Sequence, residues 1–182
     1  MAHRTRDITY FYPKPWDTGY GSELTEKRFS VLRQLDFSSV LDVGSGRCNL
    51  HQWLKDNGYE VKYDAVDIRE DALLMCQCET FTEIPDREYD LVCLFGTVTF
   101  NIGEDSRANA HTLTRLLARA REVSTKHILF TVMKRENLKG LAAFQLVGFT
   151  REETEGMAGA LGSFVIDDTT DPDEYIVTVT KE

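Results

Sequence analysis

A short apolar run that ends in glycines is the first feature of this sequence that can do chemistry. The run Val40–Val43 is followed directly by Gly44, Ser45 and Gly46. Such a run is typical of a buried parallel strand that turns sharply into a helix. Glycines let the backbone approach a bound molecule, and the N–H groups at a helix start favour a carboxylate or phosphate. Taken alone, the turn is explained equally well as a tight strand-to-helix connection.

A second strand, expected over residues 60–68, carries Asp67, which lies 21 residues after Gly46. An acidic side chain in this place can accept hydrogen bonds from ribose hydroxyls. Asp67 can also cap the next helix, and the two roles can coexist. A dinucleotide site needs a third glycine where this chain has Asn49, which would crowd a pyrophosphate. The two features together therefore predict a nucleoside-containing cofactor and disfavour a nicotinamide or flavin dinucleotide.

Alternating elements are expected to position these residues. Strands are expected over residues 40–43, 60–68, 78–81, 89–95, 127–133, 163–168 and 174–181. Helices are expected over residues 23–35, from an N-cap at Asn49 to Asn57, and over residues 70–77, 109–123 and 150–161, the last with a capping box between Thr150 and Glu153. This alternation predicts an α/β fold with a doubly wound parallel sheet. The 182 residues fit a single domain, with residues 1–22 as an aromatic arm and 23–182 as a Rossmann-like core.

Five segments resemble class I S-adenosylmethionine-dependent methyltransferases. VLDVGSGRCNL at 40–50 is similar to the first motif of that family, acid-x-Gly-x-Gly-x-Gly, with Cys48 in place of the third glycine. The other similar segments are AVDI at 65–68, YDLVCLFGTVTF at 89–100, HILFTVM at 127–133 and the closing EYIVTVTKE. The resemblance covers residues 23–182. It implies three α/β/α layers around a mostly parallel seven-stranded sheet with an antiparallel C-terminal strand, and S-adenosylmethionine as cofactor.

The resemblance also implies roles by position. The implied residues are Asp42 for the amino-acid end of the cofactor, Gly44, Ser45 and Gly46 for close backbone contacts, Asp67 for the ribose hydroxyls, Ile68 and Phe81 for adenine, and Phe95 and Gly96 for the methionine part. Because the cofactor carries the reactive group, in-line alignment and proximity account for most of the expected catalysis. No catalytic residue is assigned.

Polar and aromatic residues outside these motifs are candidates for the substrate side. They are Tyr12, Trp16, Tyr20, Asn101 and His111. The aromatic segment 12–20 is interpreted either as a lid over the cofactor or as an arm packed on the domain edge. His111 is better explained as an ordinary helix residue than as a base. Arg28 can reach the cofactor carboxylate, although a solvated helix charge is the simpler interpretation.

The net charge and the cysteine spacing argue against some classes of protein. The net charge of −9 opposes non-specific nucleic-acid binding. The four cysteines, Cys48, Cys76, Cys78 and Cys93, show no zinc-ligand spacing, so we expect reduced thiols and no metal, with Cys93 in the core. We find no signal peptide and no apolar run of roughly 20 residues. We therefore expect a cytoplasmic protein that does not bind membranes and is a monomer by default.

The preferred function is a methyltransferase for a small-molecule acceptor, because a short chain leaves little room for a target-recognition domain. The alternatives are a methyltransferase for protein or RNA that works with a partner chain, and a non-catalytic S-adenosylmethionine-binding module. The sequence lacks a P-loop, a G-x-S-x-G elbow and the Asn/Asp-Pro-Pro-Tyr/Phe motif of amino-group methylases, whose position here reads Phe-Gly-Thr-Val at 95–98.

Overall fold

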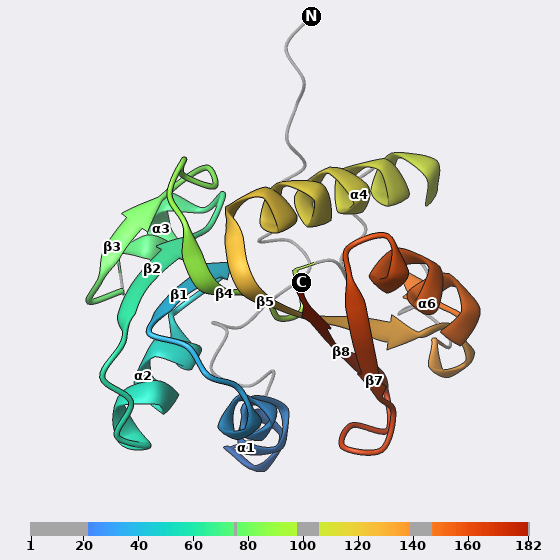
Figure 1. Ribbon diagram of the computed structural model, residues 1–182, viewed down its shortest axis with the longest axis horizontal. Helices are drawn as coiled ribbons and strands as arrows, with labels where there is room; N and C mark the ends of the chain where they lie inside the picture. Colours follow the sequence, from blue (N-terminus) through green and yellow to red (C-terminus); the bar gives the residue numbers. More distant parts are fainter. Residues whose placement is uncertain (1–21, 75, 98–105, 139–146, 182) are drawn as a thin grey trace, which may run out of the picture.

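One mixed sheet forms the centre of the molecule. The computed structural model describes residues 22–74, 76–97, 106–138 and 147–181 (Figure 1). Its strands are β1 (Ser39–Val43), β2 (Lys62–Val66), β3 (Glu79–Phe81), β4 (Tyr89–Leu94), β5 (Ser124–Lys134), β6 (Gly148–Phe149), β7 (Ser163–Asp167) and β8 (Glu174–Thr180). Their order is β3-β2-β1-β4-β5-β8-β7, and β6 pairs with β5.

Strand directions match the expected pattern. Neighbours from β3 through β5 pair in parallel, and β8 runs antiparallel to both β5 and β7. The predicted doubly wound, mostly parallel sheet with an antiparallel C-terminal strand is therefore confirmed. The two-residue strand β6, which lies parallel to the end of β5, was not expected from the sequence.

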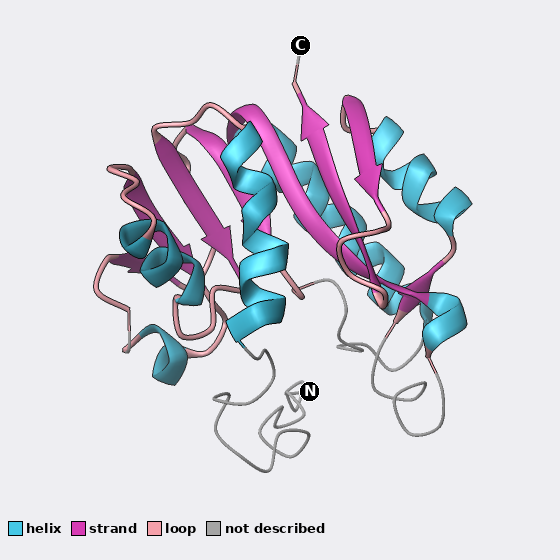
Figure 2. Ribbon diagram, turned by 90° about the horizontal axis from the view of Figure 1, so that it is seen from below, coloured by secondary structure: helices cyan, strands magenta, loops and turns pink. Residues whose placement is uncertain are grey.

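Helices cover both faces of the sheet, as Figure 2 shows. They are α1 (Ser22–Ser30) with the 3-10 turn η2 (Val31–Gln34), α2 (Asn49–Asp56), α3 (Glu70–Leu73), α4 (Ser106–Val123), the 3-10 turn η3 (Arg135–Asn137) and α6 (Arg151–Gly159). No helix among the described residues is long and apolar enough to span a membrane.

The core is divided into two apolar layers, one on each face of the sheet. Side chains alternate between faces along a strand. On β1, Val40 packs with residues of α1, α2 and α3, whereas Leu41 and Val43 pack with residues of α4 and α6. Cys93 is fully buried in the first of these layers, as expected. The predicted three-layer arrangement follows from this alternation.

Capping patterns in the sequence predicted some helix boundaries correctly and others wrongly. The capping box is present: Thr150 Oγ1 accepts from Glu153 N at 3.2 Å, and Thr150 N donates to Glu153 Oε2 at 2.8 Å. Helix α3 ends at Leu73, earlier than predicted. The prediction of Asn49 as a helix N-cap is wrong, because Cys48 holds that position and Asn49 is already helical.

Candidate functional site

Three parallel strands end side by side. Val43 of β1 pairs with Val66 of β2, and Val66 pairs with Phe81 of β3. The residues that follow these strands therefore share one edge of the sheet, the edge at which open α/β sheets bind ligands. This register brings the glycine-rich turn after β1 next to Asp67 after β2, as the sequence predicted.

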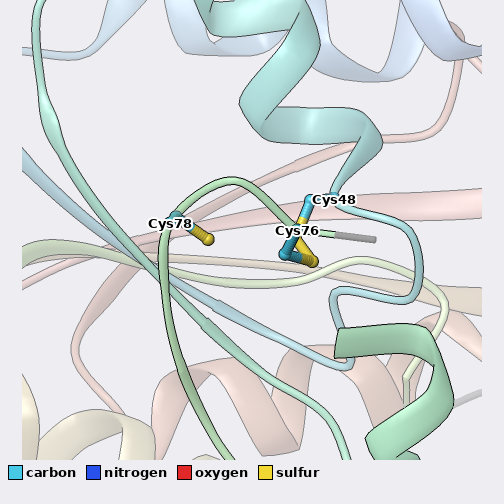
Figure 3. Close-up of side chains that lie close together, drawn as sticks. All are labelled: Cys48, Cys76 and Cys78. Atoms are coloured by element: carbon cyan, nitrogen blue, oxygen red, sulfur yellow. A yellow bond between two sulfur atoms is a disulfide. The ribbon is translucent and has the colours of Figure 1, made fainter. Parts of the chain in front are cut away.

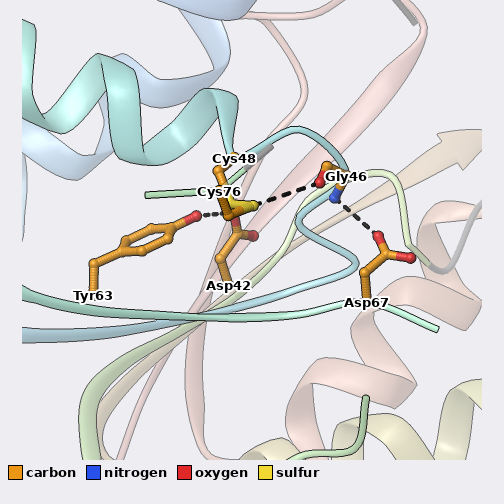
Figure 4. Close-up of a disulfide and its surroundings, with 6 residues drawn as sticks. All are labelled: Asp42, Gly46, Cys48, Tyr63, Asp67 and Cys76. Carbon is orange, nitrogen blue, oxygen red and sulfur yellow. Dashed lines mark hydrogen bonds between the residues drawn. A yellow bond between two sulfur atoms is a disulfide. The ribbon is translucent and has the colours of Figure 1, made fainter. Parts of the chain in front are cut away.

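The turn after β1 is fixed by the end of β2. Gly44 N and Ser45 N both donate to the Val66 carbonyl, at 2.7 and 3.1 Å. Gly46 N donates to Asp67 Oδ2 at 2.9 Å (Figure 4), and Arg69 N donates to Asp67 Oδ1 at 2.9 Å. Each carboxylate oxygen can accept more than one hydrogen bond. Asp67 thus shapes the local turn and retains acceptor capacity for hydroxyl groups.

The two glycines of the turn are needed for different reasons. Both have a positive φ, +75° at Gly44 and +51° at Gly46, a region that favours glycine. A Cβ on Gly44 would lie 2.8 Å from Thr97 Cγ2 and closer still to Thr97 Oγ1, whereas a Cβ on Gly46 would meet no atom of the described residues within 4 Å. Thr97 Oγ1 in turn donates to the Val43 carbonyl at 2.5 Å. Gly44 therefore makes room for Thr97, a residue that sequence reasoning missed, whereas no described residue crowds Gly46.

Cys48, in the third-glycine position of the motif, also has a left-handed backbone, with φ +59°. Non-glycine residues adopt this conformation at a cost of roughly 1–2 kcal/mol. Here the residue is held in place at the start of α2 by a disulfide to Cys76. The substitution of the third glycine thus preserves the backbone shape of the motif.

Side chains beside the turn offer one polar and several apolar groups. Ser45 is buried, and its Oγ has no hydrogen-bond partner among the residues that the structure describes. Ile68 is 72 % exposed. Phe81 is half-buried with the Arg87 guanidinium 5.1 Å from its ring centroid. A cavity of about 480 Å³ opens between α3 and β3 and is lined by Glu70, Leu73, Leu74, Thr80, Phe81 and Thr82.

Asp42 lies behind the turn, in the interior. Its carboxylate accepts a hydrogen bond from the Tyr63 hydroxyl (Figure 4), and the Tyr63 ring stacks on His51 at 4.4 Å. Burial raises the pKa of Asp42 to about 7, with the charge of Asp67 adding to the rise and the Tyr63 hydrogen bond opposing it. Asp42 can therefore change its charge near neutral pH.

The end of β4 is hydrogen-bonded to a row of buried polar side chains. Gly96 N donates to Thr131 Oγ1 at 2.9 Å, and the Thr131 hydroxyl also bonds to Glu174. Arg28 Nη2 donates to Glu174 Oε2 at 2.5 Å and is 3.7 Å from Asp171 Oδ2. The interpretation of Arg28 as a solvated charge is wrong, because the residue is only 4 % exposed and its ion pairs reach strand β8 and the β7–β8 turn. Phe95 itself packs edge-on against Phe29, with ring centroids 5.0 Å apart.

Two of the four cysteines differ from expectation. Cys48 and Cys76 form a disulfide, so the prediction of reduced thiols is wrong for this pair, whereas Cys78 and Cys93 are free. The Sγ atoms of Cys48, Cys76 and Cys78 all lie within 4.8 Å of one another (Figure 3). Burial, with the charges of Asp42 and Asp64, raises the pKa of Cys78 to about 11. Spacing along the chain did not reveal this cluster, because it forms only when the start of α2 meets the segment between α3 and β3.

The structure describes only one of the five candidates for the substrate side. Tyr12, Trp16, Tyr20 and Asn101 lie outside the described residues. His111 is exposed on α4. The described part of the site therefore consists of the predicted cofactor-binding residues.

Comparisons with known proteins agree on the fold. No protein-family model matches the sequence, and no curated protein matches it. Among solved structures, magnesium protoporphyrin IX methyltransferase from Synechocystis PCC 6803 with bound SAH aligns with a TM-score of 0.67 at 13 % identity, over 88 % of this chain and 84 % of that one. The PH0226 protein from Pyrococcus horikoshii OT3 aligns with a TM-score of 0.68 at 12 % identity, over 97 % and 99 %.

A third similar structure belongs to a larger assembly. A chain of the Pnkp1/Rnl/Hen1 RNA repair complex aligns with a TM-score of 0.62 at 14 % identity, over 89 % of this chain and 42 % of that one. At these identities the likeness concerns the fold. The strand order, the glycine-rich turn and these alignments lead to one conclusion: the chain has the fold of the class I S-adenosylmethionine-dependent methyltransferases.

Proposed function

We propose that the protein is an S-adenosylmethionine-dependent methyltransferase whose acceptor is a small molecule. The observation that carries the proposal is the meeting of the glycine-rich turn with Asp67 at the carboxyl edge of the sheet. This is the edge at which such sheets bind nucleoside ligands. The bound SAH of the magnesium protoporphyrin IX enzyme supports the choice of cofactor.

The nucleoside half of the cofactor fits the side of the turn near β2 and β3. Asp67 retains acceptor capacity for two ribose hydroxyls. Ile68 follows directly, and its exposed side chain offers an apolar surface on which an adenine ring can pack. Phe81, at the end of β3, lines the neighbouring cavity and flanks the same region.

The amino-acid half fits the side of the turn near β1 and β4. The buried Ser45 hydroxyl has no partner within the described part of the chain, and a buried hydroxyl gains by finding one in a bound molecule. Asp42 supplies a carboxylate whose ionised form is disfavoured by burial. A positively charged ligand nearby would favour that form. We assign Gly96 at the end of β4, which is held by its hydrogen bond to Thr131, to the same half.

The bound cofactor supplies an activated methyl group on a sulfonium centre. The chain then has to hold the two reactants in line and keep water away, a contribution that can reach roughly 7–11 kcal/mol. We assign the acceptor to the side of the described residues that follow β4, from Phe95 to Thr97. We assign no general base.

The net charge favours a small-molecule acceptor over RNA. The chain has a net charge of −9, which opposes binding to a phosphate backbone. The similar structures include a porphyrin methyltransferase and a chain of an RNA repair complex, so both classes enter the test.

The test is incubation of the full chain with S-adenosylmethionine labelled on the methyl group. Separate reactions contain a small-molecule extract, total RNA or a protein fraction, and Asp67→Asn enzyme serves as the control in each. Label transferred only in the small-molecule reaction, and lost with the variant, supports the proposal. Transfer only to RNA or protein would replace the acceptor class. Cofactor binding without transfer to any fraction would leave a binding module instead of an enzyme.

A further inference from the structure

A cluster of three sulfur atoms lies next to the glycine-rich turn and is not used by the function proposed above. Cys48 is the N-cap of α2, and Cys76 and Cys78 lie on the segment that leads from α3 to β3. The three Sγ atoms are within 4.8 Å of one another, and the first two are joined in a disulfide (Figure 3). Cys48 is buried, whereas Cys76 and Cys78 are half-buried.

We propose that, when the Cys48–Cys76 disulfide is reduced, Cys48, Cys76 and Cys78 form a binding site for one thiophilic metal ion of the zinc class. Thiolate sulfur is the ligand that such ions prefer. Zinc–sulfur bonds are about 2.3 Å long, so three sulfurs around one ion stand about 4 Å apart. The three Sγ atoms, which lie within 4.8 Å of one another, are already close enough for this arrangement. Only the bonded pair has to separate, and its Cα atoms are 5.5 Å apart.

The chemistry balances in two steps. A dithiol reductant gives two electrons and two protons to the disulfide, which becomes two thiols while the reductant becomes its own disulfide. The metal ion then replaces the protons of the three thiols, which pass to the buffer. Three protein ligands leave one of the four positions usual for zinc to water. Cys76 and Cys78 are partly exposed, so water can reach the site.

The surroundings favour a cation. The carboxylates of Asp42 and Asp64 act electrostatically on Cys78, each more strongly than the opposing positive charge of Lys55. Their negative charge opposes a free thiolate, which makes Cys78 a poor nucleophile for exchange with the neighbouring disulfide. The same charge attracts a metal ion, and a coordinated thiol gives up its proton to the metal. The position of Cys78 thus suits a ligand better than a resolving cysteine.

Metal binding would act on the same two segments that the disulfide joins. Cys76 Sγ is 3.8 Å from the Gly46 carbonyl oxygen, and Cys48 holds the left-handed backbone after the turn. Either the disulfide or the metal ion would therefore link the turn to the segment before β3. The proposal does not depend on the identity of the cofactor or on methyl transfer.

The test uses the full chain, reduced with a phosphine, freed of reductant without oxygen, and titrated with Zn²⁺ in a calorimeter. Cd²⁺ serves as a second probe, because its thiolate complexes absorb in the ultraviolet. We expect one Zn²⁺ per reduced chain and no comparable binding to the same chain with the disulfide intact. Cys78→Ser should weaken binding at least tenfold. Cys93→Ala is the matched control, since Cys93 is buried outside the cluster, and it should bind as the wild type does.

Two results would overturn the proposal. One is a reduced wild type that binds Zn²⁺ no more tightly than Cys78→Ser does. The other is equal loss in Cys93→Ala, which would point to general unfolding. The comparison of reduced with oxidised wild type needs no substitution, so it decides the question even if a variant fails to fold. Failure of adenosylmethionine binding would leave these results unaffected.

Discussion

The close packing of Gly44 against Thr97 allows a sharp prediction about the glycine-rich turn. Gly44→Ala places a Cβ in a left-handed backbone and 2.8 Å from Thr97 Cγ2. Gly46→Ala places one in a similar backbone, with no atom of the described chain within 4 Å. The second variant is therefore a matched control that carries the backbone strain without the steric overlap.

The expected loss in the free energy of unfolding can be separated into backbone strain and steric overlap. A left-handed alanine costs roughly 1–2 kcal/mol in either variant. In Gly44→Ala, moving Thr97 adds roughly 1–3 kcal/mol of overpacking and endangers its hydrogen bond to the Val43 carbonyl, worth about 1 kcal/mol. In the unfolded chain, alanine has less conformational freedom than glycine. This difference offsets part of the lost stability, and it does so equally in both variants. Gly44→Ala should therefore lose about 2–4 kcal/mol more than Gly46→Ala does.

Urea unfolding of both variants, with the disulfide intact, measures the two free energies of unfolding. Adding Thr97→Ala to Gly44→Ala should recover part of the loss, with a coupling energy of at least about 1 kcal/mol in a double-mutant cycle. Equal stabilities of the two glycine variants would refute the reasoning, because Thr97 would then not pack against the turn.

Three further predictions concern stability. Arg28→Met leaves the Glu174 carboxylate buried without that ion pair, so the free energy of unfolding should fall by about 3–5 kcal/mol; wild-type stability in urea would contradict the burial of the pair. Thr150→Ala removes the cap of α6 and should cost about 1 kcal/mol in the same assay, whereas no loss would mean that the capping box is not formed. The Ser38 hydroxyl, with its backbone N–H, lowers the pKa of Asp90 from 3.8 to about 2, so the ionised carboxylate stabilises the fold above pH 4 and this is lost as the pH falls towards 2. Asp90→Asn should cost about 2 kcal/mol at pH 7 and should weaken the acid dependence between pH 4 and 2, to which Asp167, whose pKa is also lowered to about 2, contributes as well; an unchanged pH profile would contradict the assignment.

The sheet could be predicted because its strands are apolar runs with distinct ends. The run at 89–95 and the run at 127–133 both became central strands. Strand β5 extends further, from Ser124 to Lys134, because its ends are set by pairing with β4 and β8 and not by its own hydrophobicity. The early end of α3 likewise depends on where the following segment meets α2.

The site could be predicted only where it follows from strand ends. Gly44 and Asp67 were found because residues after neighbouring parallel strands must meet at one edge. The partners that hold them were not found, because each comes from elsewhere in the chain: Thr97 follows β4, and Tyr63 reaches Asp42 across the sheet. The Cys48–Cys76 disulfide bridges 28 residues with no spacing rule to reveal it.

The central claim is that the carboxyl edge of the sheet binds S-adenosylmethionine through Asp67. The most direct test is calorimetric titration of S-adenosylhomocysteine and NAD into wild type, Asp67→Asn and Asp36→Ala, the last changing an aspartate that is 97 % exposed before β1. We predict that wild type and Asp36→Ala bind S-adenosylhomocysteine and not NAD, and that Asp67→Asn binds at least tenfold more weakly, a loss of about 1.4 kcal/mol. Equal affinity of Asp67→Asn and wild type, or no binding by folded wild type at millimolar ligand, would contradict the account.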